Sequence, residues 1–248
     1  MALLTLEVVV YNIESALRAQ EAGADRIELC ADPGAGGTTP SYGAIEVIRQ
    51  NVSIDVYVMI RPRGGDFLYS SYEFHAMKRD LIQCQRLSVD GVVFGILNED
   101  GTVDKKRCRE IIQRARPLRL TFHRAFDRTP DPFQALEDCI ELGFDRILTS
   151  GQKGSAGEGA ELIGKLVDQA RGRISIMAGA GVNPENAATL VREHGVKELH
   201  FSALSYRESK MKWNNTDLKA MGSDADNEFK VRTIDPEFIA SIRNLQYF

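Results

Sequence analysis

The sequence predicts a single (β/α)8 barrel, also called a TIM barrel, as one domain over residues 1–248. Short β-rich runs alternate with amphipathic stretches along the whole chain, and successive runs begin roughly 20 to 36 residues apart, as βα units require. The length of 248 residues suits one barrel of this kind. A short internal repeat supports the same count of units.

The β-rich runs are eight in number and are enriched in branched and aromatic residues. In chain order they are Leu4–Val10, Arg26–Cys30, Val56–Arg61, Gly91–Gly95, Leu120–Arg124, Arg146–Thr149, Ile174–Ala178 and Glu198–Ser202. Eight parallel strands with helical connections predict a closed barrel.

Helical periodicity fills the intervals between these runs. The expected helices are Glu14–Ala22, Pro40–Arg49, Phe74–Leu87, Lys105–Ala115, Pro132–Leu142, Gly159–Ala170, Pro184–His194 and Asp235–Leu245. The helix from Pro132 has the clearest signals, because Asp131 can cap its start and Gly143 can end it.

A five-residue repeat falls where helices precede the second and sixth strands. Gly23–Ile27 reads Gly-Ala-Asp-Arg-Ile, and Gly143–Ile147 reads Gly-Phe-Asp-Arg-Ile, 120 residues later. That spacing corresponds to four βα units, so the repeat agrees with a barrel built from two similar halves.

Composition excludes several classes of protein. A net charge of -4 provides no basic surface for nucleic acid or for an anionic membrane. The run Met1–Val10 is short, carries Glu7 and has no basic start, so it predicts a strand rather than a signal peptide. The cysteines form no CxxC pair and no disulfide pattern, which favours reduced thiols in the cytoplasm. They are Cys30, Cys84, Cys108 and Cys139.

The segment 205–232 is the least regular part of the sequence and follows the last predicted strand. We expect a long loop over the mouth of the barrel, where it serves either as a lid or substrate loop or as a disordered connector.

Polar side chains gather at the carboxyl ends of the predicted strands, where barrel enzymes place catalytic groups. The two-residue period puts Glu28 and Cys30 on one face, and Met59 and Arg61 on another. If these faces point inward, Glu7, Glu28, Arg61, His123 and His200 converge. Alternatively, Glu7 and Glu28 belong to a buried ion-pair network, and His200 is a hydrogen-bonded core residue.

His123 is the strongest candidate for catalysis, since it begins the segment His-Arg-Ala-Phe-Asp at the end of the fifth strand. In an enzyme, His123 would be the general acid or base and Glu28 a second proton-transfer or orienting group. Arg61 and Arg124 would hold an anionic substrate, with Asp127 in the same motif as Arg124.

Two further segments could bind an anion. Ala178-Gly-Ala-Gly-Val182 ends the seventh strand and precedes a helix, so Gly179, Gly181 and Ser202 could hold phosphate, with help from Ser150 and Gly151. A tight turn that requires small residues is the alternative. Arg61–Phe67 reads Arg-Pro-Arg-Gly-Gly-Asp-Phe, which is either an anion clamp or a loop stiffened by an Arg–Asp pair.

Taken together, these segments resemble the CutC family of copper homeostasis proteins. The matching pieces are residues 23–30, 36–41, 60–67, 121–127, 148–152 and 177–182. The resemblance implies a TIM barrel, a cytoplasmic location, a link to copper and assembly into a homo-oligomer, either a dimer or a tetramer. It also implies a Cu(I) site in which Cys30 pairs with a cysteine near the end of the first strand. This sequence has Val9 at that position, so Cys30 would act alone, with Met59 or with His123.

Two functional hypotheses follow. One is a cytoplasmic copper homeostasis protein that binds Cu(I) at Cys30. The other is a lyase or isomerase type of enzyme that acts on a small anionic or phosphorylated metabolite. A third hypothesis, a purely structural or interaction protein, is the weakest, because it gives no role to the polar residues at the carboxyl ends of the strands.

Overall fold

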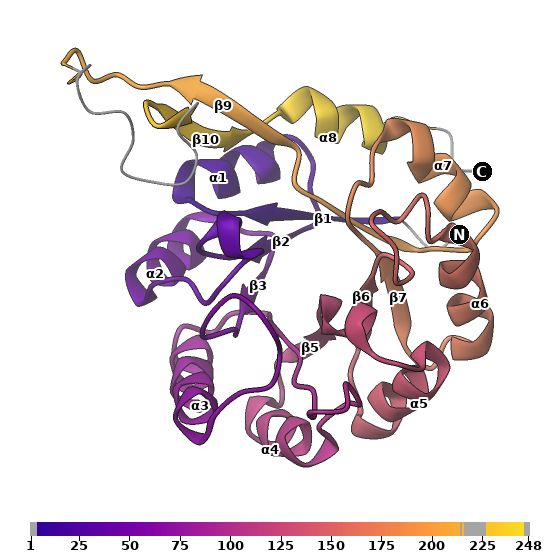
Figure 1. Ribbon diagram of the computed structural model, residues 1–248. Helices are drawn as coiled ribbons and strands as arrows, with labels where there is room; N and C mark the ends of the chain where they lie inside the picture. Colours follow the sequence, from indigo (N-terminus) through magenta and orange to yellow (C-terminus); the bar gives the residue numbers. More distant parts are fainter. Residues whose placement is uncertain (1–3, 214, 216–226, 246–248) are drawn as a thin grey trace.

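A computed structural model describes residues 4–213, 215 and 227–245 and confirms the predicted barrel (Figure 1). Eight parallel strands hydrogen-bond in sequence order, and β8 closes the ring on β1. The strands are β1 Thr5–Val10, β2 Arg26–Leu29, β3 Asp55–Met59, β4 Gly91–Phe94, β5 Arg119–Phe122, β6 Arg146–Thr149, β7 Ser175–Ala178 and β8 Glu198–Phe201.

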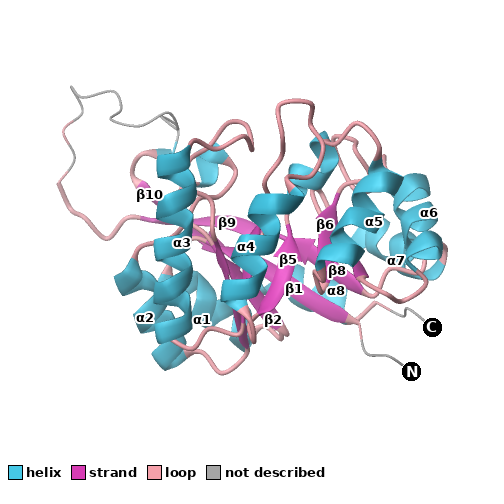
Figure 2. Ribbon diagram, turned by 90° about the horizontal axis from the view of Figure 1, so that it is seen from below, coloured by secondary structure: helices cyan, strands magenta, loops and turns pink. Residues whose placement is uncertain are grey.

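The α-helices lie outside the strands, as Figures 1 and 2 show. The described part of the chain contains eight of them. They are α1 Ile13–Glu21, α2 Tyr42–Asn51, α3 Ser71–Arg86, α4 Lys105–Ala115, α5 Pro132–Leu142, α6 Ala160–Ala170, α7 Pro184–Arg192 and α8 Pro236–Arg243. The predicted bounds of α4 and α5 are confirmed. Over the described residues, no helix is both long enough and apolar enough to cross a membrane.

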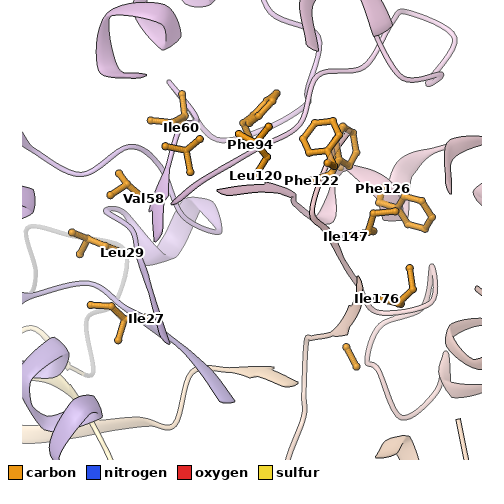
Figure 3. Close-up of a cluster of buried hydrophobic side chains, with 14 of the residues drawn as sticks. Ile27, Leu29, Val58, Ile60, Phe94, Leu120, Phe122, Phe126, Ile147 and Ile176 are labelled. Atoms are coloured by element: carbon orange, nitrogen blue, oxygen red, sulfur yellow. The ribbon is translucent and has the colours of Figure 1, made fainter. Parts of the chain in front are cut away.

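The apolar core lies between the strands and the surrounding helices. Alternate strand residues such as Val8, Ile27 and Val58 are fully buried there, and Figure 3 shows several of these side chains. The residues between them, including Glu7 and Tyr57, therefore point into the barrel, because successive side chains on a strand face opposite sides. Because of this alternation, the candidate residues on the strands point into the interior of the barrel.

The internal repeat plays the same structural role in both halves. Gly143 ends α5 with φ 84°. Asp25 accepts a hydrogen bond from the Leu6 amide at 2.7 Å, and Asp145 accepts one from the Leu120 amide at 2.8 Å. Each aspartate thus fastens the beginning of its own strand to the strand before it.

The two described ends of the segment 205–232 differ from the expected loop. These ends belong to β9 Leu204–Glu208 and β10 Lys230–Ile234, which form an antiparallel ribbon (Figure 1). Asn12 donates to the Arg232 carbonyl at 2.8 Å, so the ribbon is fixed beside α1. The expectation of a long irregular loop is wrong for these ends. Residues 214 and 216–226 lie outside the described residues.

Candidate functional site

A cavity of about 390 Å³ opens at the carboxyl ends of the strands. Five of the residues predicted to form the site line it, and they come from three different βα units. They are Glu28, Arg61, His123, Arg124 and Asp127, together with Val9, Met59, Phe67 and His200. The structure therefore brings together most of the residues that the strand ends predicted.

An ion-pair network lies beneath the cavity. Arg26 contacts both Glu7 and Glu198, and Arg146 binds Glu198 at 3.0 Å. Arg26 and Arg146 also each lie 4.8 Å from the ring centre of Tyr57. Sequence reasoning named Glu7 but missed the two arginines, although both are the fourth residue of the internal repeat. The network supports the structural interpretation of Glu7.

His200 connects this network to the cavity. Its Nδ1 lies 2.8 Å from Glu7 Oε1, and its Nε2 lies 3.7 Å from Glu28 Oε2. Burial alone would lower the pKa of His200, but the carboxylates of Glu28 and Glu7 raise it above its usual value. His200 is thus a buried, hydrogen-bonded residue, in line with the alternative stated for it.

Glu28 is only partly satisfied in the described structure. Its Oε2 accepts from the Cys30 thiol at 3.6 Å, while its Oε1 is buried without a hydrogen-bond partner among the described residues. Burial raises the pKa of Glu28 to about 7, against the lowering effect of the neighbouring His200. The carboxyl group is therefore poised to exchange a proton near neutral pH.

Two sulfur-containing side chains are buried in one cluster, and one of them, Met59, also lines the cavity. Cys30 and Met59 belong to one buried cluster with Val9. A methyl group placed on Gly37 would lie 3.1 Å from Cys30 Sγ and 3.7 Å from Met59 Cε, so both side chains lie directly beneath Gly37. Burial, with the nearby Glu28 carboxylate, raises the pKa of the Cys30 thiol well above its usual value.

Arg61 is anchored by backbone oxygens. Its guanidinium donates to the carbonyls of Ala35, Gly37 and Gly65 at 2.7, 2.8 and 3.0 Å. Its neighbour Arg63 behaves differently, because it pairs with Asp66 at 2.9 Å, as the stiffened-loop alternative expects. Arg61 therefore binds backbone carbonyl groups, whereas Arg63 forms an ion pair within the loop.

His123 begins a 3-10 helix, Arg124–Arg128, rather than continuing the strand as predicted for Arg124. Its Nδ1 accepts from the Ala125 amide at 3.2 Å, so the ring proton of the neutral form is on Nε2. Burial, with the positive charge of Arg61, lowers the pKa of His123 to about 3. The neutral ring is suited to donate a hydrogen bond. Its role as a general acid or base stays a prediction.

Asp127 organises the loops that follow β5 and β6. It accepts from Thr149 Oγ1 at 2.5 Å and from the Ser150 amide at 3.1 Å, and it pairs with Arg124 at 2.8 Å. Arg124 also donates to Ser150 Oγ at 2.9 Å. These bonds engage both carboxylate oxygens and hold Arg124 and the start of the loop after β6 in place, and a part of Asp127 in catalysis stays a prediction.

The residues proposed to hold phosphate lie outside the lining of the cavity described above. Gly179 and Gly181 do not line the cavity described above, and Ser202 borders a separate hollow with Leu204. The start of α7 is capped internally, because Asn183 accepts from the amides of the two residues Glu185 and Asn186. The tight-turn alternative accounts for this segment, and phosphate binding there stays a prediction.

Comparisons with known proteins agree with the fold. The sequence profile of the CutC family matches residues 4–205. The chain is 46% identical over 240 residues to the Homo sapiens protein named copper homeostasis protein cutC homolog, covering 97% of this chain and 87% of that protein. It is 47% identical to the family protein CutC of Histophilus somni, covering 97% and 98%.

A solved structure is also similar. The crystal structure of CutC from Streptococcus agalactiae superposes with a TM-score of 0.77 at 36% identity, covering 80% of this chain and 98% of that one.

Proposed function

The chain belongs to the CutC family, and from that premise we propose that it takes part in copper homeostasis by binding Cu(I) as cargo. The proposed ligands are the thiol of Cys30 and the thioether of Met59. The observation that carries the proposal is that these two sulfur side chains share one buried cluster beneath Gly37, and that Met59 also lines the cavity.

The donor set fits Cu(I) better than a harder ion. Thiolate and thioether are soft ligands, which Cu(I) prefers, whereas carboxylate oxygens suit Mg²⁺, Ca²⁺ or Mn²⁺. A second group of possible ligands, Glu7, Glu28 and His200, has ligand atoms within 4.8 Å of one another. Glu7 and His200 already bind each other there, so this group is less available to a metal.

The cavity also provides a path for the thiol proton. Only the thiolate binds a metal, so the Cys30 proton must leave when Cu(I) arrives. Glu28 Oε2 accepts from that thiol at 3.6 Å and is the acceptor in contact with it. Glu28 therefore has a role in loading even though it is not a ligand.

The proposal also covers domain organisation, location and assembly. We propose one domain over residues 1–248, a cytoplasmic location and a homo-oligomer, either a dimer or a tetramer. The net charge of -4 supports the absence of nucleic-acid and membrane partners.

Anaerobic competition between the protein and a strong Cu(I) chelator tests the ligands. Cys30→Ser is expected to weaken Cu(I) binding by at least about 100-fold, and Met59→Leu by about 10-fold, since each removes one soft donor. Cys139→Ala, which changes a buried cysteine on α5, serves as the matched control and should leave the affinity unchanged. Equal affinity in wild type and Cys30→Ser would refute the site.

A further inference from the structure

Arg61 is a buried cation for which the described structure supplies no anion. Its side chain is 6% exposed, and its hydrogen bonds go to three neutral carbonyl groups. Among the ion pairs of the described residues, none includes Arg61. A buried charge is costly unless an opposite charge compensates it, so the site favours an anionic ligand.

Neither carboxylate that lines the cavity pairs with Arg61 in the described structure. Glu28 contacts the Cys30 thiol and His200, and Asp127 pairs with Arg124. The ring of Phe67 lies 5.1 Å from the Arg61 guanidinium and compensates its charge only in part. An anionic ligand would supply the negative charge that the described carboxylates do not place beside Arg61.

His123 offers a second donor at the same end of the cavity. Because Nδ1 accepts from the Ala125 amide, Nε2 carries the proton, and this buried atom has no partner among the described residues. The His123 ring also packs on Phe67, with ring centres 4.9 Å apart. Gly95 makes room for it, since a methyl group there would lie 2.7 Å from the imidazole.

We propose that Arg61 and His123 form a subsite for the carboxylate group of a small metabolite. Within the described part of the chain, two buried N–H donors of these side chains have no hydrogen-bond partner, namely Arg61 Nε and His123 Nε2. Together they offer one positive charge and two hydrogen bonds, which matches a single carboxylate better than a phosphate dianion. The cavity of about 390 Å³ has the size of a small-molecule site.

Phe67 packs on both side chains, and both donor atoms are buried, so a ligand would displace the Phe67 ring to reach them. Exclusion of water strengthens the charged hydrogen bonds. The subsite goes beyond the copper proposal and does not depend on it, because Cys30 and Met59 take no part. It also supplies the binding group that the hypothesis of an enzyme acting on a small anion requires.

Titration of ¹⁵N-labelled protein with acetate, pyruvate and inorganic phosphate, at constant ionic strength, tests the proposal. The side-chain Nε–H signal of Arg61, identified by its loss in Arg61→Lys, should shift with each carboxylate and less with phosphate. Pyruvate affinity should fall at least 10-fold in Arg61→Lys and in His123→Phe. Arg119→Lys is the matched control, since this exposed arginine begins β5 at the opposite end of the barrel.

If Arg61→Lys proves unstable, His123→Phe still tests the proposal. A thermal unfolding curve of His123→Phe that matches wild type shows that weaker binding is not caused by loss of the fold. The subsite is refuted if no carboxylate shifts the Arg61 signal at concentrations of about 10 mM, or if both variants bind pyruvate like wild type. Tighter binding of phosphate than of pyruvate would overturn the ligand class.

Discussion

Glu7 shows how a charged residue becomes part of a barrel interior. It has no exposed surface, yet Arg26 and His200 both contact it. Burial alone would raise the pKa of this carboxyl group, but the charges of these partners hold it far below its usual value of 4.5. The folded state therefore keeps Glu7 ionised where the unfolded chain would accept a proton.

Glu7→Gln should lower the free energy of unfolding at pH 7 by about 3 to 5 kcal/mol, because Arg26 loses a buried partner. Because the pKa of Glu7 is lower in the folded state than in the unfolded chain, its ionised carboxylate stabilises the fold at pH values above the unfolded pKa. This stabilisation is lost as the pH falls. The difference in unfolding free energy between wild type and Glu7→Gln should therefore shrink by up to about 1.4 kcal/mol for each pH unit below 4.5. Urea unfolding across this range measures it, with exposed Glu99→Gln as the control. A difference that grows toward low pH would contradict the assignment.

Val9 occupies the position where the family resemblance implies a second cysteine, and it shares a buried cluster with Cys30. Val9→Cys should therefore add a thiolate ligand and tighten Cu(I) binding by at least about 10-fold in the chelator competition. Val8→Cys is the matched control, because Val8 lies in the core between strands and helices. Equal effects of the two substitutions would argue against a metal site inside the barrel.

At the scale of elements, Asp25 and Asp145 fasten equivalent strands in the two halves of the barrel. Replacing either with alanine leaves a backbone amide unpaired and should cost about 1 to 3 kcal/mol of unfolding free energy. The two sites share no partner, so the double variant should be additive within about 0.5 kcal/mol. Chemical denaturation measures all three variants beside exposed Asp168→Ala. A larger coupling would show that the halves are not independent at these positions.

The periodicity of the sequence was sufficient to predict most of these elements. Strand alternation and helix caps are local signals, and α5 begins and ends where Asp131 and Gly143 indicate. The ribbon β9–β10 was missed because its partly exposed strands alternate weakly and pair only with each other. Arg124 was placed on a strand because no local signal marks the 3-10 helix that His123 caps.

At the scale of the whole molecule, the site depends on contacts between distant strands. The two-residue period of the strands predicted which side chains point inward. As that prediction implies, Glu28, Arg61 and His123 line one cavity. The partners of these residues could not be predicted. The carbonyls that hold Arg61 come from two loops, and the arginines beside Glu198 lie on strands far apart in the sequence.

X-ray absorption at the copper edge of the Cu(I)-loaded, anaerobic protein tests the central proposal most directly. We predict two sulfur neighbours around copper in the wild type, from Cys30 and Met59, and one in Met59→Leu. A copper environment of only nitrogen and oxygen neighbours, or a sulfur count that Met59→Leu does not change, would contradict the proposed site.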